Sequence, residues 1–330
     1  MSASEIDIFS EHERMISAPL GRLLPAASYV DFEGVEHMGL IMGASLAGAS
    51  VRLSVTGCYG APGLYSEGSL LISASDATLA RLTRGPRTYR DAIESKVILR
   101  AADRQRVTQN NYFQAMSYCA DYRSFFPPYF PLGRSSDGLM GYLLTHIDRS
   151  AWIGHLPFAI SHAVSNHRPY QVSLKEAFKR LRVTDLMTVL ITSCSTKGGL
   201  SMSKASKILG EQLIAISGMS RKGFLAKLTT LVAGSRIRLV DSIDVRLSGL
   251  DITSAGCRKD LLKLRANVWQ SINEGEIVIA SDLQAFYGSE ETLRLFQLYV
   301  HSFGKLLTQW GLICTVTRDV WEQSGGIVRT

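Results

Sequence analysis

The stretch that decides the organisation of this chain is YRSFFPPYFPLGRSSDG, residues 122–138. Its prolines at positions 127, 128 and 131 exclude a helix and remove donors that a central strand would need. We therefore expect a rigid, aromatic-rich loop. The loop leads into an apolar helix over 139–147 and places Arg134 and Asp137 near its start. Stiff loops beside a helix start commonly hold functional charged groups.

Asp137 and Arg134 each allow two interpretations. Asp137 suits a general base, or an acid that holds a substrate hydroxyl. Aspartate is also a favoured N-cap, so Asp137 could simply begin the helix that follows. Arg134 could bind a phosphate or carboxylate in a bidentate contact, or it could form a salt bridge to Asp137 or Asp121.

A second segment, GHLPFAISH at residues 154–162, contains two histidines on either side of a proline. His155 and His162 could face one site as metal ligands or as an acid–base pair. The other interpretation is that each is a core or surface residue without a chemical role.

Further upstream, residues 57–63 are rich in chain-breaking residues and predict a loop after a strand over 51–55. The backbone amides of such a loop, including those of Gly60 and Gly63, could cradle a phosphate. Glu67 is the nearest acid, and the spacing matches neither of the common nucleotide-binding glycine motifs.

Charge is unevenly distributed along the 330 residues. From Gln171 onward there are 21 Lys and Arg against 14 Asp and Glu; the totals of 36 and 29 leave 15 against 15 upstream. A basic second half suits an acidic partner, a phosphorylated ligand or nucleic acid. Acids are interleaved throughout, which favours a solvated helix surface. Because basic and aromatic residues do not alternate, we do not expect nucleic acid as a partner.

Cysteine usage and the N-terminus bear on the compartment. The five cysteines are scattered and odd in number, which predicts free thiols in a reducing compartment. The polar start MSASEID is unlike a secretory signal, and no apolar run reaches the roughly 18 residues of a membrane span. We expect a cytoplasmic protein without a membrane span.

The two halves of the chain differ in their hydrophobic patterns. Upstream of residue 170, alternating strand-like and helical segments predict an α/β domain with a mixed sheet over 1–170. Downstream, apolar residues at three- and four-residue spacing predict an all-α domain over 171–330.

The segments quoted above resemble a group of bacterial GT-A-fold glycosyltransferases that we associate with natural-product and modified-peptide gene clusters. The resemblance covers about residues 10–170 and follows four segments in order: EHER with Leu20-Gly21, the loop YGAPG at 59–63, PPYFPLGRSSDG at 127–138, and GHLPFAISH at 154–162. It implies a partial GT-A-like sheet and transfer of a sugar from a nucleotide-sugar donor to a peptide or small-molecule acceptor.

The resemblance also implies roles for single residues. Asp137 would engage the acceptor hydroxyl as the catalytic residue, and Arg134 would steady the donor phosphates. His162, or else His155, would approach a divalent metal, Mn²⁺ or Mg²⁺. Such chains usually begin with a nucleotide-binding half, which is not seen here: either the chain is a fragment, or a partner chain supplies that half, or donor binding has been lost. An oligomer is also possible.

The rival interpretation is a non-catalytic binding or scaffold protein. Its basic helical half would hold a partner protein or nucleic acid.

Overall fold

The computed structural model describes most of the chain. Its described residues are 6–17, 29–31, 49–60, 71–72, 74, 76–95, 97–102, 104–109, 117–133, 135–162, 181–196, 199–249, 255–274 and 278–324.

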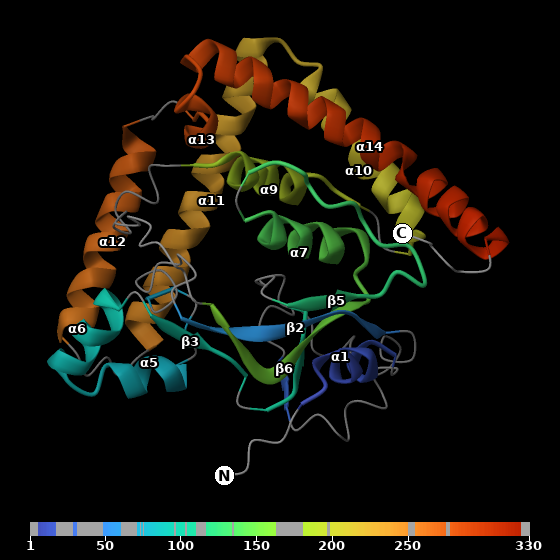
Figure 1. Cartoon of the computed structure of the whole chain (residues 1–330). Coiled ribbons are helices and arrows are strands. Elements are labelled where there is room, and N and C mark those ends of the chain that lie inside the picture. The colour runs from blue at the N-terminus through green and yellow to red at the C-terminus, as the bar shows by residue number, and fades with distance from the viewer. Residues whose placement is uncertain are drawn as a thin grey trace.

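The first half of the chain forms a mixed, curled six-stranded sheet (Figure 1). The strand order is β1-β4-β6-β2-β3, and β5 also pairs with β2. The two long strands, β2 and β6, run parallel and are neighbours. The strand bounds are β1 Tyr29–Asp31, β2 Ser50–Gly60, β3 Ile98–Arg100, β4 Arg106–Thr108, β5 Tyr118–Ala120 and β6 Ala151–His162.

Helices cover both faces of this sheet. Helix α1 (Ile8–Ser17) places Met15 and Ile16 against Val51 and Trp152 on one face. Helix α7 (Ser136–Ile147) packs on the other face, where its Met140 and Leu144 share a cluster with Leu53, Val55 and Ile153. In Figure 1 the sheet accordingly lies between α1 and α7. The predicted strand–helix alternation of this half is confirmed.

An extra residue in β2, Arg52, explains why Val51 and Leu53, which are two positions apart, face opposite sides of the sheet. Val51 pairs with Trp152 and Leu53 pairs with Ile153, so Arg52 has no partner in β6. A bulge of this kind redirects the side chain of the inserted residue. Arg52 is buried and lies 3.7 Å from a carboxylate oxygen of Asp121 and 3.7 Å from one of Asp148.

The loop predicted over 57–63 is wrong for residues 57–60, which continue β2. Both edges of β2 are paired there, because Gly60 lies opposite His162 of β6 and Ile98 of β3. Glycine in a strand often marks a close backbone approach. A Cβ at Gly57 would lie 2.3 Å from the Arg100 carbonyl oxygen, and one at Gly60 would lie 2.4 Å from that of His162.

After residue 181 the structure describes helices and their connections, as the sequence predicts. The apolar spacing predicts a helix over 223–232, whereas α11 is one helix through residue 249. The same spacing predicts a helix over 283–310, which is divided into α13 and a longer α14. The bounds are α9 Val183–Ser193, α10 Met202–Ser217, α11 Arg221–Gly249, α12 Ala255–Asn273, α13 Ser281–Gln284 and α14 Ser289–Gln323; earlier in the chain lie α5 Asp76–Leu82 and α6 Pro86–Glu94.

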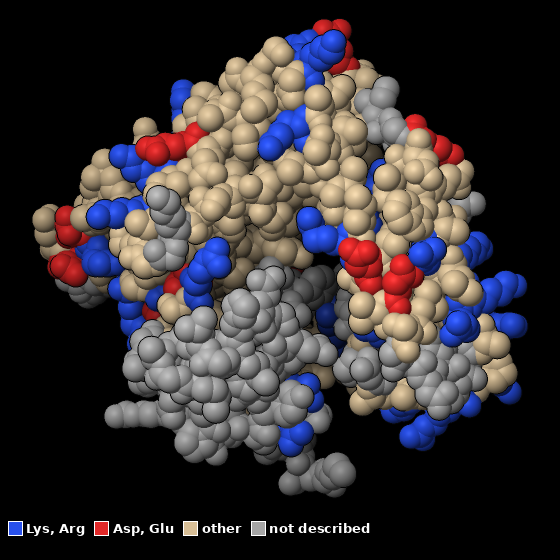
Figure 2. Space-filling view, turned by 180° about the vertical axis from the view of Figure 1, so that it is seen from behind, with Lys and Arg blue, Asp and Glu red and all other residues tan. Residues whose placement is uncertain are grey.

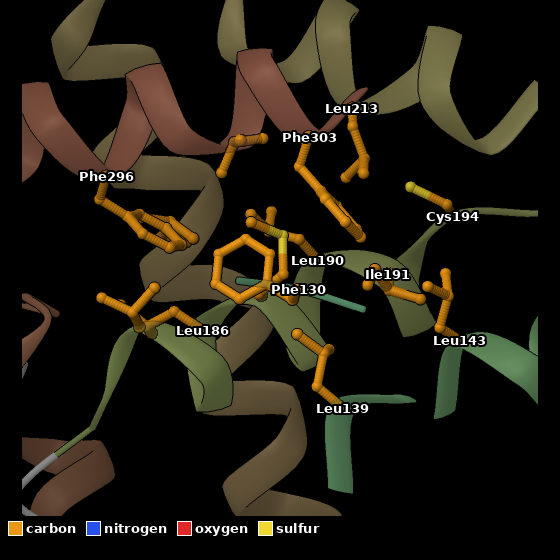
Figure 3. Packing of buried hydrophobic residues seen from close by; sticks show 14 of the residues in the cluster. Phe130, Leu139, Leu143, Leu186, Leu190, Ile191, Cys194, Leu213, Phe296 and Phe303 are labelled. Carbon is orange, nitrogen blue, oxygen red and sulfur yellow. The ribbon is translucent and has the colours of Figure 1, made fainter. Parts of the chain in front are cut away.

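The proline loop of residues 121–133 is irregular as predicted, and it joins the helical core. Phe130 lies 3% exposed, 5.1 Å from Phe303 between ring centroids and nearly perpendicular to it. Figure 3 shows Phe130 surrounded by side chains that include Leu186, Leu190 and Phe296. A second cluster packs Leu79 and Tyr89 against α12. Two core clusters therefore contain residues from both sides of residue 170, and the division into two domains stays a prediction.

The helices α10 and α14 cross at two glycines. A Cβ at Gly210 would lie 2.5 Å from the Gly304 carbonyl oxygen, and one at Gly304 would lie 2.8 Å from that of Gly210. Only glycine permits backbones to approach this closely, so these two positions fix where the helices cross.

Within the described residues, none of the helices combines the length and the apolar character that a membrane crossing requires.

Candidate functional site

A cavity of about 950 Å³ opens between the C-terminal half of α14 and the sheet region. Its walls come from α1, from β5, from the first part of the proline loop and from α14. The lining is mainly apolar and aromatic, with a few charged side chains. It comprises Glu13, Ile16, Cys119, Ala120, Asp121, Tyr122, Arg123, Ser124, Phe126, Trp310, Ile313, Cys314, Thr317, Arg318, Trp321 and Glu322.

One face of α14 forms the wall farther from the sheet. Trp310, Cys314, Thr317 and Trp321 recur at spacings of four, three and four residues, which brings them to the same side of a helix. The indole N–H of Trp310 donates a hydrogen bond of 2.6 Å to the Phe126 carbonyl oxygen. This bond fixes the helix to the proline loop at the inner end of the cavity.

The opposite wall is held by a buried ionic network. Arg52 donates hydrogen bonds to the Ser124 hydroxyl and to the Phe125 carbonyl oxygen. Burial alone raises the pKa of Asp121, but hydrogen bonds from Arg123 and the charge of Arg52 outweigh that effect and lower it. Asp121 therefore stays ionised near neutral pH, and it orients Arg123 at the cavity through a contact of 2.9 Å.

Aromatic rings continue from the cavity wall toward α7. Tyr122 lies 4.7 Å from Phe126 between ring centroids, and Tyr118 lies 5.9 Å from Tyr129. Burial raises the pKa of Tyr122, and nearby Tyr118 and Cys314 add to the rise. Burial likewise raises the pKa of Tyr129, with smaller contributions from Tyr118, Tyr122 and Asp137. Tyr129 packs against the cluster that contains Met140 and Leu144 of α7, so the aromatic rings lead from the cavity wall to that helix.

Two thiols line the cavity, and both are neutral at ordinary pH. Burial raises the pKa of Cys119, and the charge of Asp121 raises it further. Burial also raises the pKa of Cys314. Because the thiolate is the reactive form, neither is placed to act as a nucleophile. All five cysteines of the chain are free, as predicted.

Asp137 lies in the first turn of α7, two residues after the N-cap. The N-cap position belongs to Ser135, whose φ of 68° is left-handed, so the interpretation of Asp137 as the cap is wrong. One carboxylate oxygen of Asp137 accepts a hydrogen bond of 2.9 Å from the Gly138 amide. The charge of Asp137 also contributes to the raised pKa of Tyr129.

The two histidines lie far apart on β6. His155 is opposite Val55 of β2 and His162 is opposite Gly60. Five residues of strand separate these partners, or about 16 Å at 3.3 Å per residue. One metal ion cannot bind both side chains, so the shared site proposed for them is wrong.

A metal site that includes His162 would need ligands from other residues. His162 has a buried Nδ1 without a hydrogen-bond partner, which leaves one nitrogen for a further contact. Across the described ranges, however, no three His, Cys, Asp or Glu side chains gather closely enough to hold a metal ion. The described residues do not supply a full ligand set for Mn²⁺ or Mg²⁺.

The remaining predicted site residues are not brought together. Arg134, Gly63 and Glu67 lie outside the described residues, and Gly60 belongs to β2. Of the predicted site residues that the structure describes, none lines the cavity. The sequence signal that we missed is the tryptophan pair on α14, whose spacing of eleven residues is close to three helical turns.

Comparison of the chain with protein-family models, with curated proteins and with solved structures gave no match. The likeness to glycosyltransferases therefore stays a prediction from the residues quoted above, and the cavity has to be interpreted from its own chemistry.

Proposed function

We propose that the chain is a binding protein that holds an elongated, mainly apolar ligand, such as a peptide segment, in the cavity beside α14. The observation that carries this proposal is the cavity itself. Its volume of about 950 Å³ lies in the range of ligand sites, which are mostly apolar with a few polar groups that set orientation.

The character of the lining favours a peptide. Tyr122 and Trp321 are 61% and 49% exposed, so two large aromatic faces are available to a ligand. Tyrosine and tryptophan dominate the binding energy of many peptide and protein interfaces. Charges of both signs, including Arg318 and Glu322, line the same space and suit the termini and polar groups of a peptide.

The test is selection of peptides from a displayed random library against the whole chain, followed by affinity measurement. We expect Trp321→Ala to weaken a selected peptide at least about 10-fold, as expected for an aromatic anchor. Trp269→Ala is the matched control, because Trp269 is 37% exposed on α12, away from the cavity. Equal effects of the two substitutions, or no selectable peptide, would contradict the proposal.

A second candidate function is sugar transfer to such a bound acceptor, and the position of Asp137 favours it. The Asp137 carboxylate is not used as the helix cap, and its charge contributes to the raised pKa of Tyr129. As general base it would take the proton of an acceptor hydroxyl, while Arg134 would neutralise the donor diphosphate.

This second function has its own test, independent of peptide selection. We expect calorimetric titration with uridine and guanosine diphosphates, with and without Mn²⁺, to show saturable binding. Asp137→Asn should abolish sugar transfer with little change in melting temperature. A large loss of stability would instead assign Asp137 a structural role. Peptide binding without nucleotide binding would leave the binding protein as the function.

A further inference from the structure

The hairpin of α5 and α6 carries an array of exposed arginines. Arg81, Arg84, Arg87 and Arg90 recur at every third residue, and all four are exposed. None of them forms an ion pair with a residue of the described part of the chain. Four guanidinium groups are thus presented to solvent within ten residues.

Helix α12 extends this positive surface. The Tyr89 hydroxyl donates a hydrogen bond of 2.6 Å to an Asp260 carboxylate oxygen, and Tyr89 packs in a common core cluster with Leu261 and Leu264. These contacts lay α6 directly on α12. The exposed Lys263 follows Asp260 by three residues, so it lies on the flank of α12 that meets α6 and the arginine array.

Few acids offset this charge. Asp91 and Glu94 are exposed on α6, and Asp260 is engaged by Tyr89. Among the side chains that the structure describes on this surface, five exposed cations therefore stand against these three acids. Figure 2 shows blue side chains gathered at the lower right, on the side of the molecule that carries α5, α6 and α12.

We infer that the α5–α6–α12 surface binds the phosphate backbone of double-stranded nucleic acid without reading its sequence. Arginine is the preferred residue for phosphate because its planar fork can donate two parallel hydrogen bonds. Across α5 and α6 no large apolar side chain is among those exposed, whereas on α12 Leu262 and Trp269 are 47% and 37% exposed. A membrane-binding surface normally adds apolar residues to its charges, so the arginine hairpin of α5 and α6 fits nucleic acid better than a bilayer.

The proposed partner differs from the one expected from charge along the sequence. The residues upstream of 171 are neutral in sum, and the excess lies downstream. The fold places the arginines of α5 and α6 beside Lys263 of α12, and the combined surface exists only in the folded chain.

The test is fluorescence anisotropy of a labelled 20-base-pair duplex of mixed sequence with the full chain, from about 50 to 200 mM salt. We expect a Kd between about 1 and 100 μM and a logarithmic salt slope near −0.9 for each phosphate contacted. The double substitution Arg87→Ala with Arg90→Ala should weaken binding at least about 10-fold at 50 mM salt. It should also make the slope shallower by about 1.8.

The matched control removes the same charge elsewhere. Arg221 and Arg294 are surface arginines paired with Glu290 and Glu291, so Arg221→Ala with Arg294→Ala should leave duplex binding within about 2-fold. Both pairs of substitutions are exposed, and an unchanged melting temperature verifies folding. No duplex binding, equal loss in both variants, or stronger binding to phosphatidylserine vesicles than to the duplex would overturn the inference.

Discussion

The two halves of α14 belong to one unbroken helix but have opposite surroundings. In the first half, Leu293, Phe296, Val300, Phe303 and Leu307 are all less than 8% exposed and pack in the helical core. In the second half, Leu312, Val316 and Val320 are between 51% and 69% exposed. The first half of a long helix can thus anchor the whole helix in the core. The second half is then available to form a wall of the cavity. Figure 1 shows this second half extending past the rest of the helical layer.

The largest loss of stability should come from a substitution in the buried first half of α14. Leu307→Ala removes a side chain that is 0% exposed, and we expect the free energy of unfolding to fall by about 2–5 kcal/mol, because the cavity left behind cannot fully close. Urea unfolding followed by circular dichroism measures this loss.

The next largest loss of stability should come from a substitution at the crossing of α10 and α14. In Gly304→Ala the new Cβ would lie 2.8 Å from the Gly210 carbonyl oxygen, and we expect a loss of about 1–3 kcal/mol from overpacking. Gly234→Ala is the control, because its nearest neighbour would be an Arg238 guanidinium nitrogen at 3.9 Å. Alanine should stabilise the helix there. A stabilising Gly304→Ala would mean that the helices do not meet at these glycines.

A smaller effect is expected where the two halves meet. Trp310→Phe keeps an aromatic ring but removes the donor to the Phe126 carbonyl oxygen, at a cost of about 1 kcal/mol. Amide hydrogen exchange should increase in the loop of residues 121–126 and remain unchanged in α10. Unchanged exchange in that loop would show that the hydrogen bond does not fix α14 to it.

The smallest effect should come from the exposed half. Leu312 is 69% exposed and lies five residues after Leu307 on the same helix. We expect Leu312→Ala to change the free energy of unfolding by no more than about 0.5 kcal/mol, measured in the same urea titration. A loss as large as that of Leu307→Ala would show that another part of the molecule covers this half.

Local signals in the sequence were enough for most elements but not for their ends. The apolar run over 151–156 predicts a strand that ends before Pro157, but β6 continues to His162 although the proline lacks a donor. The pairing of β6 with β2 skips between His155 and Ala159, so the proline falls in an irregularity where no ladder bond is required. Helix α6 was missed, because its periodic apolar face becomes evident only when Tyr89 is known to be buried.

The cavity could not be predicted, because its walls are distant in sequence. Tyr122 and Trp310 both line it and are separated by 188 positions. Short-range patterns identified the proline loop and the helices separately, but which helix face meets which loop depends on packing. Asp137, Arg134 and the two histidines were picked out from local residue patterns, with roles that the resemblance implied; in the structure Asp137 is outside the cavity lining, and His155 and His162 lie at separate positions of β6.

The inserted residue Arg52 of β2 has a genetic consequence. Deleting its codon would make Val51 and Leu53 consecutive, and because side chains of a strand alternate between its faces, Leu53 would still face α7 opposite Ile153. The same deletion would remove the buried guanidinium that lies beside Asp121 and Asp148. An in-frame loss of these three bases would thus preserve the register of the sheet but take away the cation that its buried carboxylates share.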